Sequence, residues 1–319
     1  MAKDNWSDKE VALLKKRRSQ GKGWLEIANE MGRTSDSVRM KWRSLFGEVG
    51  TSGKLKDPIY ISSNLPRVGL FDVETLPMDV MVWRLFDENV GINQVISGTG
   101  LLGWAGKFLN EPDMHSDILT PEEALGKDDQ RITNSCWHFL KACDVVVGHN
   151  LAEFDSKVAN TFFLKYGLPP LKYVQIDTLK IARRNFRFDS NRLGFINRLF
   201  GIREKIENEG FPLWRACREG DADALRRMQE YNEGDIYALE DLYYKLRPYM
   251  PHVFNVALYD EIETRRCPVC GNAELKDEGY YYTPSGKWSS YRCTNCQCLF
   301  RGKTNLLSKE KRKLLGVNS

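Results

Sequence analysis

Apolar residues in the first fifty positions recur with the period of a helix. They follow i, i+3, i+4, i+7 spacing over Trp24–Met31, and the same face recurs over Val38–Leu45 after Gly32. An earlier helix is expected over about Asp8–Arg18, ending near Gly21. The pattern predicts three short helices, of which the last two are joined by a tight turn.

From Val68 the pattern changes to short strands followed by alternating helices and strands. Apolar runs predict three consecutive strands over Val68–Val73, Val80–Phe86 and Ile92–Ser97. The apolar segment Gly98–Pro121 is expected to be a substrate-facing insertion or a helix. Further elements are expected as a helix over Glu122–Ala142, a strand over Asp144–Gly148, a helix over Ser156–Tyr166, a strand over Tyr173–Asp177, and helices near Leu193–Phe200, Asp221–Glu230 and Gly234–Leu246. This order predicts a mixed α/β sheet.

The helical pattern stops near Arg265. Tyr280–Tyr282 and Trp288–Arg292 are expected to form a hairpin around Pro284–Gly286, and the chain is expected to end in a loose basic tail. The Gly, Ser and Pro residues before Val68 indicate a linker. The expected organisation is a helical domain at 1–50, a linker at 51–66, an α/β domain at 67–263, a hairpin domain at 264–303 and a tail at 304–319.

Charge is unevenly distributed, although the net charge is only +4. Residues 1–57 carry +5, residues 58–263 carry −8 and residues 264–319 carry +7. Basic segments attract polyanions, whereas an acidic centre suits divalent cations, so the distribution favours nucleic acid chemistry. The chain has no 18-residue apolar run and no apolar leader at its start, so we expect an intracellular, cytoplasmic or nucleoid-associated protein that does not enter a membrane.

The tryptophans of the N-terminal helices are evenly spaced. Trp6, Trp24 and Trp42 are separated by 17 residues each, and with three short helices this spacing resembles the Myb/SANT class of helix-turn-helix domains over residues 4–47. The resemblance implies DNA contact through the third helix, for which Arg39, Lys41 and Arg43 are the candidates. SANT-type relatives also bind protein tails, so a protein ligand stays open.

Carboxylates mark candidate chemistry in the acidic middle. Asp72 and Glu74 lie two residues apart at the end of an expected strand, where the period of two directs both to one face. Asp155 follows another strand, and Asp235 lies four residues after Tyr231 on one helical face. Clustered carboxylates repel one another unless a cation neutralises them, and oxygen ligands suit Mg²⁺ or Mn²⁺.

The ordered set D-x-E, N-x-x-x-F-D and Y-x-x-x-D resembles the DEDD exonucleases of the ribonuclease H-like superfamily over about residues 67–250. The sister branch has histidine five residues before the last aspartate; Glu230 stands here, so the resemblance is to the tyrosine branch. It implies a ribonuclease H-like mixed sheet flanked by helices. It also implies a 3′–5′ exonuclease that releases 5′-mononucleotides.

The resemblance also implies residue roles. Asp72, Glu74, Asp155 and Asp235 would hold two divalent ions roughly 4 Å apart, one activating water and both bracketing the scissile phosphate. Tyr231 would orient the attacking water, because a phenol with a pKa near ~10 is a poor base at neutral pH. Asp177 and His149 are expected to be structural.

Arginines alternate with aromatic residues between Ile181 and Arg192. Arg183, Arg184 and Arg187 lie beside Phe186 and Phe188, which is the composition of a surface that binds phosphates and stacks on bases. A solvated turn with core aromatics is the alternative.

Five of the eight cysteines lie close together near the C-terminus. Cys267, Cys270, Cys293 and Cys296 form a C-x2-C-x22-C-x2-C pattern that resembles a zinc ribbon and suits one structural Zn²⁺ ion; Cys298 is expected to be a spare thiol. Lys287 and Arg292 lie among hairpin aromatics, which could bind a nucleic acid strand or form only a small core.

Together these patterns predict a metal-dependent 3′–5′ exonuclease acting on nucleic acid, with DNA the expected substrate. Three alternatives stay open: a non-catalytic DNA-binding or recruitment protein, an RNA exonuclease, and a proofreading subunit that works with a separate polymerase or another replication or repair protein.

Overall fold

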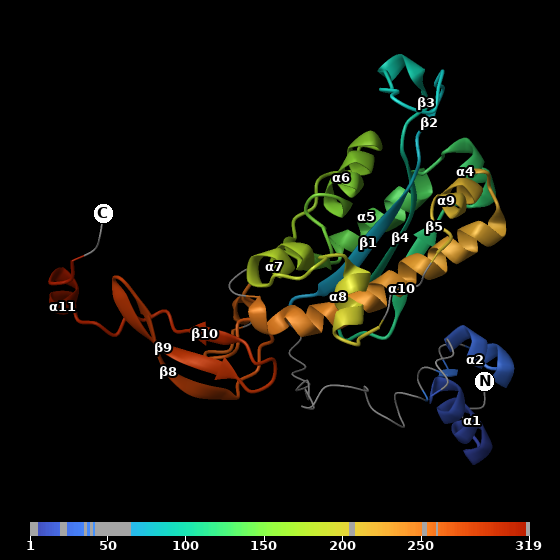
Figure 1. Cartoon of the computed structure of the whole chain (residues 1–319). Helices are drawn as coiled ribbons and strands as arrows, with labels where there is room; N and C mark the ends of the chain where they lie inside the picture. Colours follow the sequence, from blue (N-terminus) through green and yellow to red (C-terminus); the bar gives the residue numbers. More distant parts are fainter. Residues whose placement is uncertain are drawn as a thin grey trace. The chain divides into compact units, whose positions relative to one another are not determined.

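The computed structural model describes residues 6–19, 24–34, 37–38, 41, 65–203, 208–250, 254–259 and 261–316. The chain divides into two compact units, Met1–Lys54 and Leu55–Ser319 (Figure 1).

The N-terminal unit contains the first two predicted helices. α1 spans Asp8–Ser19 and α2 spans Trp24–Met31. Leu14 of α1, Ile27 of α2 and Val38 are fully buried in one hydrophobic cluster. Residues 37–38 and 41 are helical, as the predicted third helix requires, but the remainder of that helix lies outside the described residues.

A five-stranded mixed sheet forms the centre of the second unit, with strand order β5-β4-β1-β6-β7. Its strands are β1 Val68–Leu76, β4 Gly100–Phe108, β5 Met114–Ile118, β6 Val145–Gly148 and β7 Val174–Asp177. β4 runs antiparallel to β1 and β5, whereas β6 runs parallel to β1 and β7. The predicted mixed α/β sheet is confirmed.

Both expectations for Gly98–Pro121, a substrate-facing insertion and a helix, are wrong, because this segment supplies β4 and β5. All nine residues of β4 are buried, so the strand shows no alternation of polar and apolar positions. Gly106 permits close packing there: a Cβ at this position would lie 2.4 Å from the ring of Phe139. The glycines and Lys107 also interrupt the apolar run, so no continuous pattern identifies this strand.

The two strands predicted after β1 are also largely wrong. β2 comprises only Asp79–Val80 and pairs with β3, Val95–Ser97, while Ile92–Gln94 forms a 3-10 helix. The apolar residues between β2 and β3 are mostly exposed, and their apolar character alone therefore does not indicate a buried strand.

Helices cover both faces of the sheet (Figure 1). They are α4 Pro121–Gly126, α5 Gln130–Lys141, α6 Asp155–Lys165, α7 Thr178–Asn185, α8 Leu193–Leu199, α9 Phe211–Arg218 and α10 Ala222–Leu246. The single helix predicted over Glu122–Ala142 is broken at Lys127, which has a left-handed backbone. The break predicted before Gly234 is wrong, because α10 continues through it.

Adjacent residues of β1 enter different hydrophobic clusters. Phe71 and Val73 pack with Phe139 of α5, while Leu70 packs with Ile236 and Leu239 of α10. Since successive side chains of a strand point to opposite faces, Asp72 and Glu74 share the face of Leu70, towards α10.

The C-terminal segment forms a three-stranded antiparallel sheet of order β10-β9-β8. β8 spans Leu275–Thr283, β9 spans Gly286–Cys293 and β10 spans Leu299–Arg301, so the predicted hairpin is confirmed. Two 3-10 helices, Arg247–Tyr249 and Val256–Leu258, precede this sheet. The expected loose tail contains a short helix, α11, at Lys309–Lys313.

Candidate metal centre and neighbouring residues

Three carboxylates from two elements converge beside the sheet. Asp72 and Glu74 of β1 and Asp235 of α10 each offer an oxygen, and these oxygens lie within 4.8 Å of one another. Asp235 is buried, while the other two are half-buried. The pairing of β1 with β4 shifts register between Glu74 and Thr75, an irregularity of the kind that often lies next to active sites.

Asp155 is not a member of this close group. It is the first residue of α6 and is almost fully buried, and its Oδ1 accepts a hydrogen bond of 3.1 Å from the amide of Val73. Val73 stands between Asp72 and Glu74, so Asp155 is held beside the cluster. Burial raises the pKa of Asp155 to about 7.

Tyr231 lies on α10, one turn before Asp235, and its ring is buried in the core cluster. It packs edge-on against Trp214, with ring centroids 6.1 Å apart. The structure thus places Tyr231 on the helix that carries the third close carboxylate.

Asn232 contacts the cluster, although the sequence analysis does not predict it as a site residue. Its side chain is buried, and its Nδ2 donates a 2.6 Å hydrogen bond to Oδ2 of Asp72. The available signal was its position on α10, three residues before Asp235 and therefore on the same helical face.

Asp177 and His149 make structural hydrogen bonds, as the sequence suggested. Asp177 caps α7 and also accepts from the amides of Asn150 and Ala152, so it fixes the loop that leads into α6. The ring nitrogens of His149 bond Thr178 Oγ1 and the carbonyl of Asn191 at 2.9 and 2.8 Å.

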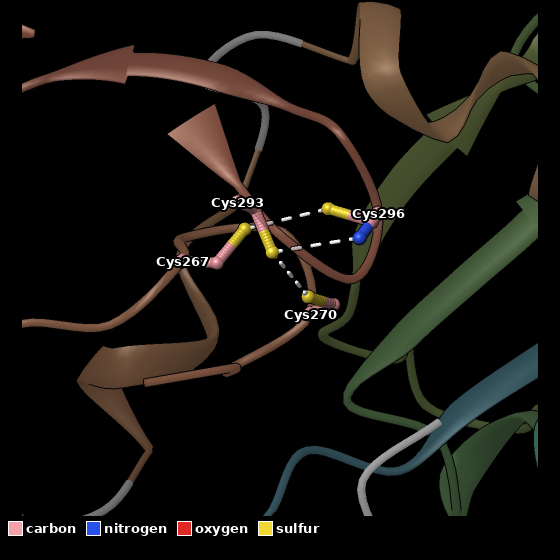
Figure 2. Close-up of side chains that lie close together, drawn as sticks. All are labelled: Cys267, Cys270, Cys293 and Cys296. Carbon is pink, nitrogen blue, oxygen red and sulfur yellow. Dashed lines mark hydrogen bonds between the residues drawn. The ribbon is translucent and has the colours of Figure 1, made fainter. Parts of the chain in front are cut away.

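Four cysteines converge at the end of β9, beside the C-terminal sheet (Figure 2). The ligand atoms of Cys267, Cys270, Cys293 and Cys296 lie within 4.8 Å of one another. The side-chain amide of Asn272 and the backbone amide of Cys296 donate to the sulfur of Cys293. Thiol groups that converge among N–H donors fit a tetrahedral metal site. Cys298 is buried but outside this group.

The predicted nucleic-acid contacts are only partly described. Arg39 and Arg43 lie outside the described residues, and Lys41 is half-buried. Arg183, Arg184 and Arg187 are exposed.

The aromatic residues near those arginines are half-buried and pack against the core. The rings of Phe186 and Phe188 stack 5.0 Å apart and pack on a hydrophobic cluster, which favours the core alternative for them. In the C-terminal sheet, Lys287 lies over Tyr280 at 3.6 Å, and Arg292 forms an ion pair of 2.9 Å with Glu278.

A cavity of about 520 Å³ lies near the C-terminal end of β1. Ser97–Gly100 line one part of it, and Val158 and Phe162 of α6 line another. Gly100 pairs with Leu76, two residues beyond Glu74 on β1.

Two parts of the chain match family models. Residues 119–247 match the model described as the RNase_H superfamily, and residues 1–52 match the one described as a Myb-like DNA-binding domain. The first match includes Asp155, Tyr231 and Asp235, whereas Asp72 and Glu74 precede it. The fold is therefore a ribonuclease H-like mixed sheet flanked by helices, with a small cysteine-bearing sheet after it.

Two polymerases resemble parts of the chain. Over 106 residues it is 32% identical to DNA polymerase III PolC-type from Ureaplasma parvum, a match that spans 33% of this chain and 7% of that protein. A solved family B DNA polymerase from Pyrobaculum calidifontis matches with 17% identity and a TM-score of 0.43, covering 57% of this chain and 25% of that one. The chain thus spans a small part of either protein.

None of the helices in the described ranges is long and apolar enough to cross a lipid bilayer.

Proposed function

We propose that this protein is a divalent-metal-dependent 3′–5′ exonuclease that acts on DNA and releases 5′-mononucleotides. The observation that carries the proposal is the convergence of Asp72, Glu74 and Asp235 within 4.8 Å. Three carboxylates at such short separations repel one another, and a bound cation would relieve the repulsion. The match to the RNase_H superfamily supports a nuclease.

The residues fit magnesium or manganese, which prefer carboxylate oxygens. Asp72, Glu74 and Asp235 would hold the ions, and Asp155, which the amide of Val73 holds beside them, would complete the set. Two ions at such a site would activate water and stabilise both the attacking and leaving oxygens of the phosphate. The amide of Asn232 orients Asp72.

Tyr231 would position the attacking water through its hydroxyl, one helical turn from Asp235. The tyrosine and the 3′–5′ direction come from the resemblance of the ordered motifs to the tyrosine branch of the DEDD exonucleases. DNA is the favoured substrate because a Myb-like DNA-binding model matches residues 1–52. The four-cysteine cluster would hold one structural Zn²⁺ ion.

The test is digestion of a single-stranded DNA oligonucleotide, labelled in turn at each end, with Mg²⁺ or Mn²⁺. The wild type should shorten the strand from its 3′ end one nucleotide at a time. Asp72→Asn should lower the rate by more than ~100-fold, beyond the usual effect of losing a group that only supports a ligand. Asp113→Asn, an exposed carboxylate between β4 and β5, is the matched control. No release by the wild type, or equal release by Asp72→Asn, would reject the proposal.

A proofreading role beside a separate polymerase is a second candidate, favoured by the 106-residue match to a PolC-type polymerase. Such an enzyme should remove a mismatched 3′ nucleotide faster than a paired one. Equal rates of nucleotide removal from matched and mismatched 3′ ends would favour general digestion of DNA over proofreading. An RNA substrate would be recognised by faster release from ribose than from deoxyribose ends of the same sequence.

A further inference from the structure

Three consecutive tyrosines of β8 are exposed rather than packed in a core. Tyr280 is 54% exposed, Tyr281 46% and Tyr282 65%. The buried cluster of the C-terminal sheet is formed by other residues, namely Cys267, Val269, Cys293, Cys296, Cys298 and Phe300. The three rings therefore lie outside that cluster, and exposed tyrosines of this kind are typical of binding surfaces, where the ring is apolar and the hydroxyl stays wet.

The pleat of β8 divides these rings between the two faces of the β8–β9 hairpin (Figure 1). Tyr280 and Tyr282 are two residues apart and share a face, whereas Tyr281 lies on the other face with Trp288. The rings of Tyr280 and Tyr282 have centroids 6.3 Å apart. Nζ of Lys287, the residue that pairs with Tyr282 across the hairpin, lies 3.6 Å from the centre of the Tyr280 ring and 5.7 Å from that of Tyr282. We call Tyr280, Tyr282 and Lys287 the platform.

The charge around the platform suits a polyanion. Residues 275–303 carry five cations against two carboxylates. One of these carboxylates, on Glu278, forms an ion pair of 2.9 Å with Arg292, so this predicted nucleic-acid contact is largely neutralised. In the part of the chain that the structure describes, the ammonium of Lys287 contacts aromatic rings and forms no ion pair. Its charge is therefore available to a phosphate.

The free backbone edge of β8 is a poor template for a strand from another protein. β8 is the outer strand of the order β10-β9-β8. Its pairing with β9 shifts register between Asp277 and Tyr280, where Gly279 has a left-handed backbone with φ 76°. A bulge of this kind twists an edge strand away from further pairing. The side-chain face of the hairpin is therefore the surface that offers binding groups.

We propose that the platform binds single-stranded DNA, with bases stacked on Tyr280 and Tyr282 and with the ammonium of Lys287 passing from the rings to a phosphate. Aromatic rings beside cations are the groups that hold unpaired strands without reading their sequence. In a duplex each base is already stacked between its neighbours, so such rings favour an unpaired strand. The inference rests on the proposed function and gives it a substrate class, a single strand that the hairpin holds while its 3′ end enters the carboxylate cluster.

The platform lies several nucleotides from the carboxylate cluster. Val269, the neighbour of Cys270, lines a small cavity together with Tyr243 of α10. Tyr243 is eight residues after Asp235 on that helix, about 12 Å at ~1.5 Å per residue. β9 separates the cysteine cluster from Lys287 by a further ~20 Å. A strand of roughly ten nucleotides, at ~3.4 Å each, covers such a path, whereas a dinucleotide is too short to occupy both sites.

The test measures binding of a thymidine oligonucleotide of about 30 nucleotides, longer than the ~10 that the path requires. The full chain carries Asp72→Asn so that the strand is not digested, and fluorescence anisotropy reports the affinity. Adding Tyr280→Ala/Tyr282→Ala should weaken binding by about tenfold or more, the effect of losing stacked bases. The matched control is Tyr281→Ala, a tyrosine of similar exposure on the same strand but the other face, which should stay within about twofold.

A conservative variant separates stacking from a structural role. Tyr280→Phe/Tyr282→Phe keeps both rings and removes only the hydroxyl groups, so its affinity for the single strand should match that of the Asp72→Asn chain. Duplex affinity should be the same in all these variants. An alanine variant that binds the single strand as tightly as its parent would overturn the platform. A loss that the phenylalanine variant shares would overturn stacking as its cause.

A second measurement locates the bases directly. A single strand that carries 5-iododeoxyuridine crosslinks under ultraviolet light to an aromatic ring in contact with that base. Peptide mapping of the crosslinked Asp72→Asn chain should place the crosslinks at Tyr280 and Tyr282. Crosslinks found only outside residues 275–303 would overturn the proposal.

Hydrolysis distinguishes failure of the platform from failure of the proposed function. With Mg²⁺, Tyr280→Ala/Tyr282→Ala should lower the preference for the long strand over a dinucleotide, the ratio of their kcat/KM values, by about tenfold. If the wild type releases no nucleotide from any substrate, the proposed function fails, while binding and crosslinking still decide the platform. A polyglutamate peptide that binds through Tyr280 and Tyr282, with single-strand affinity unchanged in the alanine variant, would show that this face docks an acidic protein instead.

Discussion

At the scale of single residues, Asn232 controls the geometry of a predicted metal ligand. Asn232→Ala removes the 2.6 Å donor to Asp72. We predict that Mn²⁺ affinity, measured by titration calorimetry on the full chain, falls by about 10–100-fold, as for other groups that orient a metal ligand. Gln229→Ala, on the same helix but bonded to Ser116, should leave the affinity unchanged. Equal affinities for Asn232→Ala and wild type would remove Asn232 from the site.

The residues that sequence reasoning found are those whose type and spacing carry a signal. The period of two in a strand places Asp72 and Glu74 together, and helical spacing relates Tyr231 to Asp235. Asn232 carried no such signal because an amide is common on helices. The position of Asp155 beside the close group involves a hydrogen bond from the Val73 amide, a contact between distant segments that no local pattern encodes.

At the scale of elements, Asp79 of β2 joins the β2–β3 pair to α9. The hydrogen bond from Ser97 and then the bonds from Arg218 hold the pKa of Asp79 at about 2, below its ordinary value of 3.8. Because the folded pKa is the lower one, the stabilisation is complete above about pH 4 and is lost as pH falls through 2.

We therefore predict that Asp79→Asn lowers the free energy of unfolding by about 1 kcal/mol at pH 7, a value reduced for the partial exposure of the clamp. The difference from wild type should shrink below pH 4. Urea unfolding at several pH values measures it, with Asp113→Asn as the exposed control. A difference that stays constant down to pH 2 would show that the charge of Asp79 is not responsible.

Elements were predicted where the local pattern of apolar residues is continuous and missed where it is interrupted. β6 is an uninterrupted apolar run between helices, and α5 has an apolar stripe, so their patterns indicated their structure. β4 is buried along its whole length, whereas the apolar residues between β2 and β3 are mostly exposed. Hydrophobicity alone does not distinguish these two cases, because the neighbours that cover β4 come from distant parts of the chain.

At the scale of the whole molecule, the basic N-terminal segment should supply salt-dependent DNA affinity. We predict that Arg39→Gln/Arg43→Gln makes the slope of log K against log salt shallower by about 1–2, since each phosphate contact contributes ~0.9. Fluorescence anisotropy with a labelled duplex measures the slope. Lys9→Gln/Lys16→Gln, which removes two charges from α1, is the matched control. If both variants change the slope equally, the third helix has no special role.

The four-cysteine cluster should stabilise the C-terminal sheet without entering the chemistry. Cys267→Ser removes one of four converging sulfurs, whereas Cys298→Ser removes a thiol outside the group. We predict that Cys267→Ser loses its bound zinc and its amide protection over β8–β10, because a structural zinc site couples metal binding to folding. Cys298→Ser should keep one zinc per chain. Dinucleotide hydrolysis should persist in both variants, because the carboxylate cluster lies on β1 and α10. Loss of dinucleotide hydrolysis together with zinc would place the cysteine cluster within the catalytic machinery.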